Sequence, residues 1–106
     1  ERMKPGIHLD KERIAEFCRR WKITEFSLFG SVLRDDFRPD SDIDVLVSFA
    51  SEAEWGLFEH VAMQEELAAV LNRKVDLITR RAVEHSRNPV RRRIILESAQ
   101  PYYVAR

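Results

Sequence analysis

Three short runs rich in β-branched and aromatic residues constrain the fold most: Ile23 to Phe29, Ile43 to Phe49 and Lys74 to Thr79. Runs of this length and composition predict β-strands. Segments with helical spacing of apolar residues separate them, and strands alternating with helices predict an α/β (α+β) domain with helices packed on a small mixed sheet of about three to four strands. A chain of 106 residues forms one domain, residues 1–106.

The helices are expected at 11–21, 31–36, 55–71 and 89–95, with 37–42 as a loop. In each longer helix the spacing predicts a buried apolar side. The residues on these sides are Ile14, Phe17, Cys18 and Trp21 in the first helix, Leu57, Phe58, Val61, Ala68 and Leu71 in the long one, and Val90, Ile94 and Ile95 in the last. For Trp55 and Phe58, at the start of the long helix, contact with a partner is the alternative to burial in the core. Residues 102–105 are expected to add an edge strand.

Three aspartates interrupt the apolar strands at positions that favour a shared site. Asp42 and Asp44 stand two residues apart at the start of a strand, so their side chains share one face. Asp76 lies within an otherwise apolar strand, where an acid without a partner costs free energy. If the two strands are neighbours, Asp76 joins the other two, and a hard cation such as Mg²⁺ would neutralise the cluster. A solvated loop edge or a helix cap is the alternative for Asp42 and Asp44.

A glycine and a serine follow the first strand, where a short helix is expected to begin. At Gly30 and Ser31 the backbone N–H groups can approach a phosphate closely, and Arg34 would share the face of that helix. An ordinary turn is the commonest reading of such a pair. Combined with the carboxylates, however, the turn favours a phosphoryl or nucleotidyl transfer that uses two metal ions.

The glycine–serine pair and the first two aspartates stand at a fixed spacing: Gly30-Ser31, ten intervening residues and then Asp42-Ile43-Asp44. This pattern resembles the signature of the polymerase-beta-like nucleotidyltransferase superfamily. The surrounding residues 28–49 are similar to the minimal nucleotidyltransferase (MNT) domains. The likeness continues through the strand that contains Asp76 to the last helix. It implies the nucleotidyltransferase fold, with a catalytic core at about residues 23–79.

The resemblance also implies roles for individual residues. Asp42 and Asp44 match paired metal ligands, and Asp76 matches the third carboxylate, a catalytic base that also faces the metal site. Gly30, Ser31 and Arg34 match the nucleotide-binding turn. MNT proteins act as antitoxins of HEPN-type ribonuclease toxins, and active members transfer AMP from ATP to a toxin tyrosine. The implied cofactor is Mg²⁺, as two ions, with ATP as substrate and a hetero-oligomer with the toxin as the assembly.

Two residues depart from the family pattern in the phosphate-binding turn. Asp35 stands where glycine is usual, and Val32 where arginine is frequent. Both changes make the turn less positive and are expected to weaken nucleotide binding. The carboxylates are retained, so we still expect activity.

The formal net charge of zero conceals strong segregation of charge. Residues 1–34 carry a net +3, residues 35–66 a net −9 and residues 73–106 a net +6. Neutrality argues against direct nucleic-acid binding in general. Arg80-Arg81 and Arg91-Arg92-Arg93 could still meet RNA or an acidic partner, or simply form a solvated face.

The chain is expected to be a soluble cytoplasmic protein without a membrane partner. It has one cysteine, and it shows neither a long apolar run nor a signal-peptide pattern. Three functions fit the residues: an enzyme that transfers AMP to a partner protein, a non-catalytic antitoxin that acts by occlusion, and a small-molecule nucleotidyltransferase that works as a dimer. Fewer than thirty residues follow the core at 23–79, which favours a protein acceptor.

Overall fold

A computed structural model of the chain describes residues 9–30 and 42–105. The elements in chain order are α1 (Lys11–Arg20), β1 (Ile23–Phe29), β2 (Ile43–Phe49), α2 (Leu57–Leu71), β3 (Val75–Thr79), α3 (Arg80–Glu84), α4 (Pro89–Ser98) and β4 (Gln100–Val104). The helix expected at 31–36 and the loop expected at 37–42, except for Asp42, lie outside the described residues. Helix α3, directly after β3, was not predicted.

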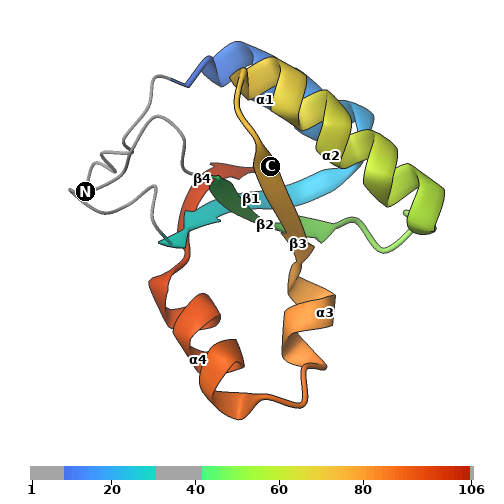
Figure 1. The fold of residues 1–106 in the computed structure, drawn as a ribbon. Helices are drawn as coiled ribbons and strands as arrows, with labels where there is room; N and C mark the ends of the chain where they lie inside the picture. The colour runs from blue at the N-terminus through green and yellow to red at the C-terminus, as the bar shows by residue number, and fades with distance from the viewer. Residues whose placement is uncertain (1–8, 31–41, 106) are drawn as a thin grey trace.

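The strands form one sheet in the order β3-β2-β1-β4 (Figure 1). Strand β1 runs antiparallel to β2 and to β4, whereas β2 and β3 are parallel. The sheet is therefore mixed and four-stranded, as the sequence predicted, and β4 is the expected edge strand. Figure 1 shows α1 and α2 side by side over one face, with α3 and α4 on the other.

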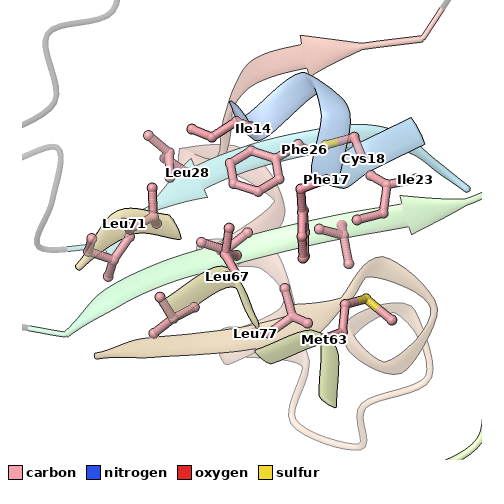
Figure 2. Packing of buried hydrophobic residues seen from close by; sticks show 14 residues of the cluster. Ile14, Phe17, Cys18, Ile23, Phe26, Leu28, Met63, Leu67, Leu71 and Leu77 are labelled. Carbon is pink, nitrogen blue, oxygen red and sulfur yellow. The ribbon is translucent and has the colours of Figure 1, made fainter. Parts of the chain in front are cut away.

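The main core lies between the sheet and the helices α1 and α2 (Figure 2). The predicted side of α1 is confirmed, because Ile14, Phe17 and Cys18 are fully buried. A smaller core on the opposite face joins Phe29 and Leu46 to α3 and α4. Alternate residues of β2 thus enter different cores, as the two-residue period of a strand requires.

Two predicted buried faces are wrong in part. Helix α2 begins at Leu57 rather than at residue 55, and it buries Met63, Leu67 and Leu71. Leu57, Phe58 and Val61 are 77%, 88% and 46% exposed. These three residues belong to the first half of α2 and are not part of the main core, which α2 enters from Met63 onward.

The same error occurs in α4, where Ile95 alone of the three expected residues is buried. Val90 and Ile94 are 65% and 60% exposed. Apolar residues on two sides of a helix leave the choice of buried side to the tertiary contacts. In α2 these contacts bury Leu71 and part of Ala68 from the predicted set, and in α4 they bury Ile95 alone.

Polar side chains of α2 occupy the outer edge of β3. The backbone N–H of Leu77 donates to Gln64 Oε1 at 2.9 Å, and the Leu77 carbonyl oxygen lies 3.0 Å from His60 Nε2. A strand edge left open is a template for pairing with another chain. Here the helix satisfies part of that edge, so α2 both covers the sheet and closes its side.

Two tryptophans attach the loop before α2 to the end of α1. Trp55 Nε1 donates to the backbone oxygen of Trp21 at 2.8 Å, and the two rings meet edge to face with centroids 5.3 Å apart. Trp21 Nε1 in turn donates to Glu66 at 3.0 Å. Trp55 is therefore a packing residue ahead of the helix.

Candidate active site

Asp44 and Asp76 are direct neighbours across the parallel pair β2 and β3. The register places Asp44 opposite Asp76, between the pairs Ile43–Val75 and Val45–Leu77. Those flanking residues enter the main core, so by alternation both aspartates lie on the α3 and α4 face of the sheet. The two strands are thus neighbours, which is the condition under which Asp76 was expected to join the other aspartates.

The two carboxylates differ in their surroundings. Asp44 is half-buried, whereas Asp76 and Asp42 are exposed. The expected cost of an acid within the apolar strand does not apply to Asp76, because Val75 and Leu77 are buried on the other face and the alternation of the strand turns Asp76 outward. Exposure leaves this carboxylate accessible to a substrate.

Gly30 lies directly against Asp44. Its φ is +78°, a left-handed conformation that glycine adopts readily and most other residues do not. A β-carbon built on Gly30 would overlap Asp44 Oδ2 and come within 3.2 Å of its Cγ. This glycine therefore serves both the turn after β1 and the close approach of the Asp44 carboxylate, which is a role that the spacing alone did not reveal.

Of the predicted site residues, Gly30, Asp42, Asp44 and Asp76 fall within the described residues. Ser31 and Arg34 lie outside them, as do Val32 and Asp35. Among residues 9–30 and 42–105, no three His, Cys, Asp or Glu side chains lie close enough to hold a metal ion together. Any metal bound here would thus draw further ligands from a substrate or from elsewhere in the chain.

Two cavities differ in their relation to these aspartates. A cavity of about 270 Å³ is bounded by Asp76, by α3 and by the start of α4, including Ser86, Arg91 and Arg92. A larger cavity of about 990 Å³ lies at the opposite ends of β2 and β3, near Trp55 and His60, and no predicted site residue contacts it. The chemistry-bearing side chains therefore favour the smaller cavity.

The family model of the nucleotidyltransferase domain matches residues 11–102. The chain belongs to this family. A protein adenylyltransferase, MntA, of Thermococcus cleftensis is 33% identical over 69 residues, which cover 65% of this chain and 68% of the relative. The family predicted from the Gly-Ser and Asp-x-Asp pattern is confirmed.

Solved structures agree with this nucleotidyltransferase fold. A protein assigned as a minimal nucleotidyltransferase is 30% identical, with a TM-score of 0.67 over 87% of this chain and 88% of its own. A toxin–antitoxin structure with AMP-PNP has a TM-score of 0.71 at 23% identity, over 92% of this chain and 76% of its own. A complex of tri-AMPylated Shewanella oneidensis HEPN toxin with MNT antitoxin has a TM-score of 0.61 at 22% identity, over 90% and 70%.

Within the described residues of this nucleotidyltransferase domain, no helix is long and apolar enough to cross a membrane.

The sequence had identified the two carboxylate positions from spacing, but it gave no sign of the cavity beside Asp76. Ser86 and Arg92 come to that cavity through α3 and the turn after it, which the sequence analysis did not predict.

Proposed function

We propose that this chain is an antitoxin that neutralises a HEPN-type ribonuclease toxin by transferring AMP from ATP to a toxin tyrosine. The observation that carries the proposal is the pairing of Asp44 with Asp76 on adjacent strands, with Gly30 against Asp44. The adenylyltransferase relative supports a protein acceptor. The toxin complexes, one with an ATP analogue and one with AMPylated toxin, support the nucleotide and the partner.

In the proposed reaction the tyrosine oxygen attacks the α-phosphorus of ATP. A phosphorus–oxygen bond to tyrosine forms, and the bond from the α-phosphorus to the bridging oxygen breaks, so pyrophosphate leaves with the electron pair. The exposed carboxylate of Asp76 takes the phenolic proton. Gly30, which follows β1 and lies against Asp44, binds the phosphates together with Ser31.

The carboxylates have the donor chemistry for Mg²⁺, which prefers oxygen ligands and is commonly held by one or two carboxylates together with substrate phosphates. Asp42 and Asp44 would hold the metal on the protein side, with Asp76 beside them. The bound metal would neutralise the phosphates and the charge that develops on the leaving group. Since substrate phosphates would supply further ligands, the site does not need three metal-binding side chains close together, and the described residues contain no such group.

The test is incubation of the chain with α-labelled ATP, Mg²⁺ and a HEPN toxin, comparing wild type with Asp42→Asn/Asp44→Asn. We expect label on the toxin that depends on both aspartates and disappears on chelation by EDTA. The isosteric change keeps the shape of the site, so binding of the toxin should persist. Full neutralisation by the double variant, with no label from wild type, would show that occlusion is the mechanism instead.

A further inference from the structure

The cavity next to Asp76 is bounded by two arginines that the proposed reaction does not use. Arg91 is exposed and Arg92 is half-buried, and both line this cavity with Asp76. Arg92 Nη1 donates to the backbone oxygen of Ser86 at 2.9 Å, which fixes part of its guanidinium group. A guanidinium group has five N–H donors, so this bond leaves others available for a ligand.

The start of α4 holds these arginines in place through its cap. Asn88 Oδ1 accepts from the backbone N–H of Arg91 at 3.1 Å, and the Asn88 N–H donates to Ser86 Oγ at 3.2 Å. The same short turn therefore caps the helix and anchors Arg92. The backbone of Arg91 and the guanidinium group of Arg92 are therefore held before any ligand binds, which reduces the entropy that Arg92 loses on binding.

Neither arginine forms an ion pair with another described residue. In the described part of the chain, the ion pairs are Arg20–Glu66, Arg80–Glu25 and Arg93–Glu97. Arg93 is thus neutralised by its own helix, whereas its two predecessors are not paired in residues 9–30 and 42–105. Two such guanidinium groups around one cavity favour a ligand with negative charge.

The strand order shows on which side of the carboxylates this ligand would lie. Asp44 on β2 has Gly30, which follows β1, on one side and Asp76 of β3 on the other. The cavity with the arginines adjoins Asp76, across β2 from the phosphate turn. Under the proposed reaction, the triphosphate occupies the Gly30 side and the acceptor the Asp76 side. The arginines then face the acceptor.

The surface continues from this cavity along α4. Arg92 also borders a second hollow of about 500 Å³, together with the exposed apolar residues Val90 and Ile94. An extended segment could thus pass from Asp76 over α4, with charge recognised at the arginines and apolar contacts beyond them. Exposed apolar residues beside unpaired charge are typical of protein-binding surfaces.

We propose that Arg91 and Arg92 are specificity-determining residues that bind an acidic side chain of the acceptor protein close to the hydroxyl that receives AMP. This inference rests on the proposed function, since that function assigns the Asp76 side to the acceptor. It adds a chemical requirement on the substrate: a carboxylate must lie near the modified tyrosine in space.

The probe is a pair of peptides that contain one tyrosine, flanked by glutamates in the first and by glutamines in the second. Their dissociation constants are measured by calorimetry with wild type, Arg91→Gln/Arg92→Gln and the control Arg13→Gln/Arg19→Gln. The control removes the same charge from exposed residues of α1, over the other face of the sheet. Hydrogen bonds between charged groups predict that wild type and control bind the glutamate peptide about tenfold more tightly or better.

In Arg91→Gln/Arg92→Gln we expect this preference to disappear while binding of the glutamine peptide stays as in wild type. Equal binding of both peptides by wild type, or no binding, would overturn the inference, as would a preference that survives the double substitution. Arg91→Gln alone keeps the bond from Arg92 to Ser86, so a partial loss there excludes unfolding as the cause. If the chain prefers the glutamate peptide but transfers no AMP to a toxin, the proposed function is refuted while the arginine site is retained.

Discussion

Asp44 and Gly30 are in such close contact that no side chain fits between them: a β-carbon on Gly30 would overlap the Asp44 carboxylate. The contact joins the end of β1 to the start of β2, next to the register pair Asp44–Asp76. A backbone conformation and a functional carboxylate are therefore coupled at one position. This coupling makes Gly30 as sensitive to substitution as the carboxylate itself.

Gly30→Ala is expected to displace Asp44 and to strain the backbone at a φ of +78°. We expect a loss of about 1–3 kcal/mol in the free energy of unfolding, by urea denaturation, and loss of AMP transfer. Gly56→Ala is the matched control, because Gly56 has an ordinary φ of −97° and a β-carbon there would meet only the flexible Glu59 side chain, at 3.1 Å. Equal effects of both substitutions would contradict this account.

Asp76→Asn should separate stability from activity. Like charges directly opposite on neighbouring strands destabilise a sheet, so neutralising Asp76 should leave the free energy of unfolding unchanged or raise it by about 0.2–1 kcal/mol. Loss of the catalytic base should lower the single-turnover rate constant of AMP transfer by about 10²–10⁴-fold. Thermal unfolding and single-turnover AMP transfer measure the two effects. A clear drop in stability would show that Asp76 has a structural role.

Gln64→Ala should open the outer edge of β3. The Leu77 N–H then loses its acceptor, and we expect a cost of about 1–3 kcal/mol in unfolding free energy with faster hydrogen exchange at the Leu77 amide. Glu65→Ala, at the neighbouring exposed position of α2, should change neither. Unchanged protection of Leu77 in Gln64→Ala would mean that the side-chain bond does not protect this edge.

Cys18 should react with alkylating reagents only after unfolding. Burial raises the pKa of its thiol from 9.0 to about 12, against a smaller lowering effect of Arg19, so the thiolate at pH 8 is about a thousandfold rarer than in an unfolded chain. Mass spectrometry after iodoacetamide treatment, with and without urea, measures this. Rapid alkylation of the native chain at pH 8 would contradict the burial of Cys18.

The same shift predicts the direction of a pH effect on stability. The thiol ionises at lower pH in the unfolded chain than in the folded one, so its contribution is complete below pH 9 and is lost as the pH rises from about 9 to about 12. Cys18→Ala removes this ionisation. The variant should therefore lose less stability than wild type between pH 8 and pH 11, as measured by thermal unfolding.

Much of the fold was predictable because its signals are local. The composition of β1, β2 and β3 identifies the strands. Asp10 and Asn88 are residue types that favour helix starts, and the side chain of each accepts a hydrogen bond from the backbone N–H three residues later. Helix α3 was missed because it is only five residues long and has a single buried residue, Val83. Such a short segment carries no measurable helical period.

The buried sides of α2 and α4 could not be read from local pattern. Each helix has apolar residues on more than one side, and the contact with the sheet selects which of them is buried. Met63, Leu67 and Leu71 are buried in α2 while Phe58 is exposed. The selection depends on where the helix crosses the strands, which is a long-range property.

By itself, the sequence determined the family, the positions of three strands and the residues of the carboxylate pattern, because spacing and periodicity are properties of neighbouring residues. Only the tertiary structure decided the strand order. That order pairs Asp44 with Asp76 and sets Gly30 against the same carboxylate. The tertiary structure also brings the start of α4 next to Asp76, so that Arg91 lines the same cavity although it lies fifteen residues later in the chain. These relationships require strand pairing and helix packing across the whole domain, which no short segment encodes.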